Sequence, residues 1–168
     1  MMSFESNIQC PKDTEARYQL LVEQCKSMIE GERNRIANLA NVAALLFHGL
    51  EDLNWAGFYL VDHKELVLGP FQGKPACIRI PIGRGVCGTA AASKETQRIK
   101  NVHDFPGHIA CDSASNSEIV IPIVVDHRVV GVLDIDSPLL DRFQEIDQQY
   151  LEAVVLLLEQ SCDWSQRN

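Results

Sequence analysis

A cysteine and three carboxylates lie within residues 111–136 and are the side chains of this sequence best suited to chemistry. Cys111 lies in a long polar loop, Glu118 follows it, and Asp134 and Asp136 stand two residues apart. A thiolate is a strong nucleophile, and a carboxylic acid held protonated among like charges can donate a proton. Unpaired acids are costly to bury, so the set indicates a ligand site or a reaction.

Two apolar runs predict the β-hairpin that positions these side chains. Residues 119–125 and 129–135 are almost continuously apolar, and a short polar turn separates them. This pattern is typical of an antiparallel hairpin whose strands are covered on both faces. Residues two apart on a strand share a face, which places Asp134 and Asp136 together.

The face on which Glu118 lies depends on the register of the hairpin. A two-residue turn, Asp126-His127, would make Glu118 oppose Ile135 and point away from the two aspartates. A three-residue loop, or a bulge in either strand, would make Glu118 oppose Asp136 and place all three acids on one face. Glu118 could also turn inward before its strand begins. A shared site requires one of these last three arrangements.

The remaining elements predict an α+β fold. A first helix is capped by Asp13 and ends at Gly31, and a final helix begins with an Asp141–Gln144 capping box. Further elements are expected as a helix over residues 36–49, strands over 55–61, 65–68, 76–82 and 97–101, and a short helix over 84–93. We therefore expect one domain, residues 1–168 with an N-terminal arm at 1–13. Its mostly antiparallel sheet is bracketed by N-terminal helices and a C-terminal helix.

Composition narrows the function classes. The chain has 168 residues, of which 46% are hydrophobic, enough to bury a sizeable core. Its formal net charge of −8 argues against binding to nucleic acid or to an anionic membrane surface. The N-terminal sequence lacks the pattern of a signal peptide, and no apolar run approaches the roughly 20 residues that span a bilayer. We expect a cytoplasmic protein whose cysteines form no structural disulfide framework.

Two other interpretations of the motifs are weaker. Gly83 to Gly88 fits the G-x-G-x-x-G dinucleotide pattern, but the sequence around it lacks repeated strand–helix–strand units. His103, His108 and Cys111, with Cys77 or Cys87, would supply enough ligands for a metal, yet their spacing fits no usual zinc pattern. We therefore expect no metal.

Four segments, taken in order, resemble the GAF domain and, more narrowly, the free methionine-(R)-sulfoxide reductases. The segments are NWAGFYL, PIGRGVCGTAA, HIACDSASNSEIVIPIV and GVLDIDS. The similarity runs from about Tyr18 to Leu158. Its most specific features are Cys77, Cys87 and Cys111 at separations of 10 and 24 residues, followed by S-x-S-E and L-D-I-D-S.

The resemblance implies an enzyme that reduces the free amino acid rather than protein-bound methionine sulfoxide. Such a reaction needs a thiolate to attack sulfur, a proton for the departing oxygen and a second thiol that resolves the sulfenic acid. By resemblance, Cys111 is the nucleophile. Cys77 and Cys87 match the resolving pair, and thioredoxin would reduce a disulfide from one of them to Cys111. No cofactor is implied, and a homodimer is possible.

The resemblance also assigns the side chains around the substrate. Glu118 and Asp136 are expected at the sulfoxide, and Asp134 at the substrate ammonium. Trp55 and Tyr59 are four residues apart on one strand, hence on one face, and match the family's aromatic wall for the substrate methyl group. Without the resemblance, aromatic residues on a strand are more often part of the core.

A rival interpretation from another class is a GAF sensor that binds a small molecule without turnover, or a freestanding redox sensor that uses the same thiols. Turnover of free methionine-(R)-sulfoxide with thioredoxin and its reductase discriminates between the enzyme and both sensors.

Overall fold

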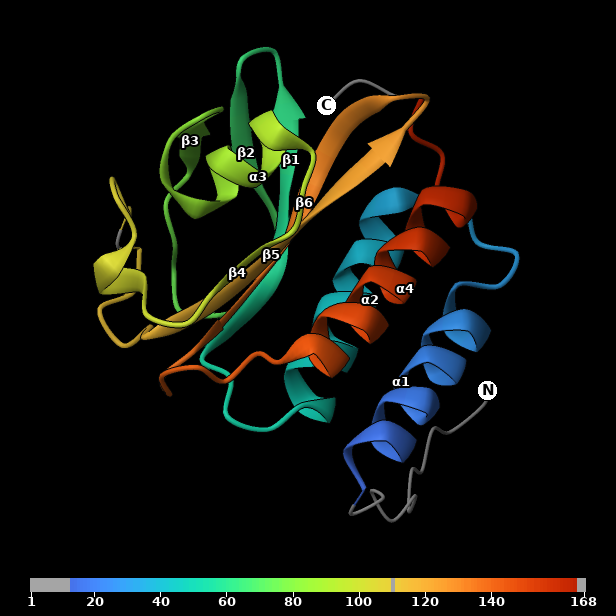
Figure 1. The fold of residues 1–168 in the computed structure, drawn as a ribbon. Helices are drawn as coiled ribbons and strands as arrows, with labels where there is room; N and C mark the ends of the chain where they lie inside the picture. Colours follow the sequence, from blue (N-terminus) through green and yellow to red (C-terminus); the bar gives the residue numbers. More distant parts are fainter. Residues whose placement is uncertain (1–12, 110, 166–168) are drawn as a thin grey trace.

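The fold is a six-stranded antiparallel sheet with helices on both faces (Figure 1). The computed structural model describes residues 13–109 and 111–165. In chain order the elements are α1 (Thr14–Ile29), α2 (Arg35–Gly49), β1 (Trp55–Asp62), β2 (Glu65–Gly73), β3 (Arg79–Pro81), α3 (Gly85–Ser93), β4 (Gln97–Ile99), the 3₁₀-helix η1 (Val102–Asp104), β5 (Ser117–Val125), β6 (Arg128–Ser137) and α4 (Glu145–Ser161). The strand order is β3-β2-β1-β6-β5-β4, which confirms the expected α+β class.

The two faces of the sheet are covered differently. Helices α2 and α4 pack on one face, and α1 packs outside them against both (Figure 1). Alternate residues of the central strands, such as Phe58, Ile121 and Leu133, fill the core on this side and are almost fully buried. On the other face, α3 packs over β5 and β6. Side chains of opposite parity along the same strands therefore face α3, and every predicted site residue on the sheet belongs to this second set.

Helix starts follow capping chemistry, with one correction. The carboxylate of Asp13 accepts a hydrogen bond from Ala16 N at 3.1 Å, which confirms the predicted cap of α1. The predicted Asp141–Gln144 capping box is wrong. Gln144 is itself the N-cap of α4, and its partner in the capping box is Asp147. Asp141 has a left-handed φ of 50° and lies before the helix. Gln is not a preferred N-cap residue, so the sequence pattern favours Asp141. The buried Asp147 carboxylate, which accepts from the Gln144 backbone N–H, places the cap at Gln144 instead.

The strand around Cys77 is shorter than predicted. Only Arg79–Pro81 forms β3, instead of residues 76–82, so Cys77 lies in the loop between β2 and β3. Pro75 has no N–H for a sheet ladder, and the Cys77 carbonyl accepts a hydrogen bond from the Tyr59 hydroxyl at 2.9 Å rather than from a strand. The segment between β2 and β3 is therefore a loop, and it holds Cys77 over the sheet.

The turn of the β5–β6 hairpin has two residues. Val125 opposes Arg128, and both intervening residues, Asp126 and His127, have positive φ values of 50° and 63°. Positive φ at both positions is the geometry of a type I′ turn, whose twist matches that of the flanking strands. This turn alone would place Glu118 on the wrong face.

A bulge in β6 restores the register. The pairing shifts between Ile123 and Val124, which leaves Val130 without an opposing residue. Because one extra residue changes the face of everything beyond it, Glu118 opposes Asp136 directly. Of the arrangements that the sequence left open, the structure confirms the two-residue turn with a bulge. The three acids share one face of the sheet.

Candidate active site

A small cavity lies between α3, the sheet face beneath it and the loop that precedes β5. Its volume is about 30 Å³, which is room for a water molecule or an ion, since a water needs at least about 10–15 Å³ on this measure. The residues that line it are Tyr59, Ile80, Val86, Cys87, His108, Ile109, Cys111, Asp112, Ser115, Glu118, Asp134 and Asp136. Seven of the eight predicted site residues lie in or beside this cavity, and the eighth, Trp55, stands behind it.

Strand pairing brings the three carboxylates together. Asp136 in β6 opposes Glu118 in β5 on one side and Trp55 in β1 on the other. Asp134 lies two residues away on the same face. Glu118 and Asp134 are each only 6% exposed, and the Oδ1 atom of Asp134 is buried without a hydrogen-bond partner. Among the described residues that line the cavity, none is a lysine or an arginine.

This crowding shifts the titration of the acids upward. Burial raises the pKa of Glu118 well above its usual range, and the nearby charges of Asp134 and Asp136 add to the shift. Burial also raises the pKa of Asp134 to about 6. The pKa of Asp136 is raised by burial and by the charge of Asp134. The site therefore favours protonated carboxylic acids, which can donate protons near neutral pH.

The three predicted cysteines are divided into a bonded pair and a free thiol. Cys77 and Cys111 form a disulfide, with a Cα–Cα distance of 5.5 Å. Cys87, in the first turn of α3, is buried and free. Its Sγ lies 3.9 Å from Glu118 Oε1. Burial, followed by the charges of Asp134 and Glu118, raises the pKa of Cys87 well above that of an ordinary thiol.

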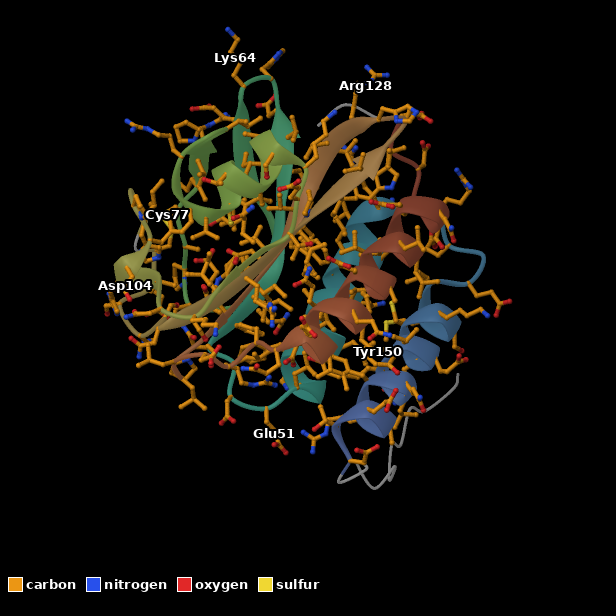
Figure 2. The ribbon with its side chains drawn as sticks, viewed as in Figure 1. Glu51, Lys64, Cys77, Asp104, Arg128 and Tyr150 are labelled. Carbon is orange, nitrogen blue, oxygen red and sulfur yellow. A yellow bond between two sulfur atoms is a disulfide. The ribbon has the colours of Figure 1, made fainter. Side chains whose placement is uncertain are left out.

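Two aromatic residues of β1 hold the loop that contains Cys77 in place through hydrogen bonds. The Tyr59 hydroxyl donates to the Cys77 carbonyl at 2.9 Å, and Trp55 Nε1 donates to the Lys74 carbonyl at 3.1 Å. The two rings lie 5.9 Å apart, and Trp55 also stacks on Phe71 with ring centroids 5.2 Å apart. Figure 2 shows Cys77 on the side of the sheet away from Tyr150 and the helical layer. Tyr59 lines the cavity, whereas Trp55 supports it from behind.

Two residues of the site, Asp112 and Ser115, were missed in the sequence because they lie in the irregular loop before β5. The amide of Asn54 donates to Asp112 Oδ2 at 3.1 Å and to Ser115 Oγ at 3.0 Å. A hydrogen bond from the Ala114 backbone N–H lowers the pKa of Asp112, and the Ser115 side chain hydrogen-bonds Asp136 and opposes the rise in its pKa. Their proximity to Cys111 and to Glu118 in the sequence was the available signal.

His108, which the sequence singled out only as a candidate metal ligand, also lines the cavity. Its Nε2 lies 3.9 Å from Glu118 Oε2. Burial lowers the pKa of His108, with a smaller contribution from His103. These two shifts favour the neutral forms of His108 and Glu118 at this end of the cavity.

Comparison with known proteins places the chain in a family. The model of the GAF domain matches residues 13–162. The chain belongs to the GAF domain family. It is 59% identical to the free methionine-R-sulfoxide reductase of Escherichia coli (strain K12) over 133 residues, which cover 79% of this chain and 81% of that protein.

Solved structures of related proteins are also similar to this chain. The fRMsr of Staphylococcus aureus in complex with substrate has 53% sequence identity and a TM-score of 0.83, and the match covers 86% of this chain and 94% of that one. The free methionine-R-sulfoxide reductase of Neisseria meningitidis, also in complex with its substrate, has 47% identity and a TM-score of 0.87, over 90% and 91% of the two chains. These relatives confirm the resemblance that the sequence motifs indicated.

The topology also decides against the dinucleotide interpretation. Gly83 N donates to Gly88 O at 2.8 Å, which closes a tight turn into α3, and the helix leads to an antiparallel strand rather than to a Rossmann unit. Of the ligand set considered for a metal, Cys111 is bonded to Cys77 in this structure, and His103 Nε2 pairs with Asn116 Oδ1 at 2.9 Å.

The pKa of Asp134 predicts how stability depends on pH. A carboxyl whose pKa is raised from 3.8 to about 6 contributes stability that is fully present below about pH 4 and is lost as the pH rises through about 6. Asp134→Asn should therefore be more stable than the unmodified chain at about pH 7.5, by up to about 3 kcal/mol. The buffer contains EDTA so that no metal ion binds the carboxylates during the measurement. The difference should shrink toward about pH 4 in thermal unfolding followed by circular dichroism.

The matched control is Glu95→Gln, which neutralises an exposed carboxylate and should leave the stability difference near zero at both pH values. A lower Tm of Asp134→Asn at the higher pH would contradict the electrostatic account of this site.

Proposed function

We propose that this GAF domain is a thiol-dependent reductase of free L-methionine (R)-sulfoxide. The observation that carries the proposal is the position of Cys111. It is bonded to Cys77 at a cavity lined by Cys87 and by acids with raised pKa values. Relatives at 59% and 53% identity are named as enzymes of this class or solved as fRMsr with substrate, which supports the same chemistry here.

The reaction proceeds in two chemical steps. The thiolate of Cys111 attacks the sulfoxide sulfur, a carboxylic acid protonates the oxygen, and methionine leaves while Cys111 becomes a sulfenic acid. The thiol of Cys77 then attacks Cys111 Sγ and expels water, which yields the Cys77–Cys111 disulfide. Two electrons and two protons from a dithiol reductant regenerate the enzyme. Cys87 is the second member of the resolving pair.

The carboxylates divide two tasks. Glu118 and Asp136 form a directly opposed pair and serve the sulfoxide oxygen, because their raised pKa values keep a proton available. Asp134, whose pKa burial raises to about 6, is ionised near neutral pH and holds the substrate ammonium. Trp55 and Tyr59 supply the aromatic wall for the methyl group.

Substrate entry requires the loop that carries Cys111 to move. The cavity of about 30 Å³ in the disulfide form holds a water or an ion rather than an amino acid. Ile109, which is 37% exposed and packs close to Gly85, closes the cavity at α3. Reduction of the Cys77–Cys111 bond releases the covalent tie between the two loops, so reduction prepares the site for the next substrate.

Thioredoxin is the proposed reductant, and the cytoplasm is the proposed location because its thiol pool keeps such a site reduced. No described helix has both the length and the apolar character needed to cross a membrane. A homodimer is compatible with this mechanism. A sensor that used the same thiols would bind its ligand, or have its thiols oxidised, a single time. The enzyme instead converts substrate repeatedly.

Cys111→Ser should abolish turnover and leave the fold intact. Serine is nearly isosteric with cysteine, but its hydroxyl is not a nucleophile at neutral pH without an activating base. The measurement is methionine formed from free methionine-(R)-sulfoxide at saturating thioredoxin. Cys25→Ala, which changes a buried thiol in the opposite core, should retain turnover. Activity of Cys111→Ser at the unmodified rate would remove this cysteine from the mechanism.

Cys77→Ser should separate the chemical step from recycling. Without added reductant, the reduced variant should still form about one equivalent of methionine per chain, because the attack by Cys111 does not need the resolving thiol. Steady-state turnover with thioredoxin should fall strongly. The same experiment on Cys87→Ser measures how much the Cys87 thiol contributes to recycling. Loss of the first equivalent in either variant would place that cysteine in the chemical step.

A further inference from the structure

We propose that Cys87, Glu118 and Asp134 form a binding site for a divalent cation of the zinc class, and that a bound cation excludes the substrate from the cavity. The site itself follows from the geometry of the three side chains. The exclusion of substrate rests on the proposed function described above, so the two parts are tested separately.

The ligand atoms lie close to the spacing that zinc requires. One ligand atom from each of the three residues lies within 4.8 Å of the other two, and Cys87 Sγ is 3.9 Å from Glu118 Oε1. Tetrahedral zinc with a thiolate and a carboxylate oxygen holds sulfur and oxygen about 3.6 Å apart. Side-chain rotations that move each ligand atom by less than about 1 Å therefore complete three corners of the coordination sphere.

An unpaired buried oxygen points independently to a ligand. Asp134 Oδ1 has no hydrogen-bond partner, although the residue is only 6% exposed. Hydrogen bonds with Cys87 and Glu118 lower the pKa of this carboxyl but leave that oxygen unsatisfied. A buried carboxylate oxygen without a partner is costly. Among the described residues that line the cavity, His108 is the only one whose side chain carries a positive charge when protonated, and its Nε2 lies near Glu118 at 3.9 Å. A cation bound between Asp134 and Glu118 would satisfy this oxygen directly.

The three ligands come from three rigid elements. Cys87 lies in the first turn of α3, Glu118 in β5 and Asp134 in the adjacent strand β6. Such a site is already formed before the ion binds, which lowers the ordering cost of binding. The cavity of about 30 Å³ also fits an ion better than an amino acid.

The donor set selects the kind of cation. A thiolate ligand favours Zn²⁺ over Mg²⁺ and Ca²⁺, which prefer oxygen ligands alone. Binding displaces the protons of Cys87 and Glu118, so the ion takes the place of these protons. Three protein ligands leave a fourth position open for water or, after reduction of the disulfide, for the thiolate of Cys111. Either way, the cation occupies the acids that the substrate needs.

The site is tested first by direct binding to the oxidised full-length chain, in which Cys77 and Cys111 are bonded and unavailable as ligands. Zn²⁺ is titrated in competition with a chromophoric chelator. We expect about one equivalent to be retained, and Cys87→Ser and Asp134→Asn each to weaken binding at least about tenfold. Cys25→Ala, which removes a thiol from the opposite core, should leave the affinity unchanged.

Co²⁺ provides a second readout that identifies the ligand. The Co²⁺-loaded oxidised chain should show a thiolate-to-metal absorption band that Cys87→Ser abolishes. Circular dichroism of each variant verifies the fold. Failure to retain Zn²⁺, or equal retention by Cys87→Ser and the unmodified chain, would overturn the site.

Exclusion of substrate is tested on Cys111→Ser, which cannot turn over. Free methionine-(R)-sulfoxide should reduce its apparent affinity for Zn²⁺ in proportion to the substrate concentration. If substrate and Zn²⁺ bind without mutual effect, the claim of exclusion is wrong while the site stands. If Zn²⁺ binds but the metal-free unmodified chain never turns over the sulfoxide, the proposed function fails and the cation site remains.

Discussion

The site depends on crowding three carboxylates onto one buried face of a sheet. The crowding is created by a single extra residue, Val130, which brings Glu118 opposite Asp136 despite a two-residue turn. Asp134 then lies beside both without a lysine or arginine among the described cavity residues. Burial raises the pKa values of all three acids, and repulsion from neighbouring acids adds to the shift at Glu118 and Asp136. These raised values make proton donation to a sulfoxide oxygen feasible near neutral pH.

The apolar core on the opposite face of the sheet offsets the free-energy cost of burying these acids. Helices α1, α2 and α4 bury a continuous apolar core there, with residues such as Phe58 and Leu133 fully enclosed. Side chains along a strand alternate between the two faces of the sheet. In these strands, one set packs into the core beneath the helices, and the other set includes the residues of the site. The loops above the site are held by specific polar bonds, from Tyr59 to Cys77 and from Asn54 to Asp112 and Ser115. A second apolar cluster on this face, against which Cys77 packs, supports them as well.

The sequence predicted the parts of the molecule that local pattern determines. The hairpin, the helices and the shared parity of Asp134 and Asp136 follow from periodicity and turn chemistry. The bulge at Val130 was only one of several open alternatives, because the apolar run around it carries no mark of where an extra residue lies. The capping box and the length of β3 were wrong, since tertiary partners of Asp147 and of the Cys77 carbonyl decide them. His108 and Ser115 belong to an irregular loop whose path no periodicity encodes.

The central claim is that this cluster of thiols and acids turns over free methionine-(R)-sulfoxide. The most direct measurement is NADPH consumption by the unmodified chain with thioredoxin, thioredoxin reductase and the free (R)-sulfoxide. The account predicts sustained consumption, with one NADPH oxidised for each methionine formed, since each cycle closes and reopens one disulfide. Binding of the sulfoxide without sustained NADPH consumption would contradict it and would favour a sensor.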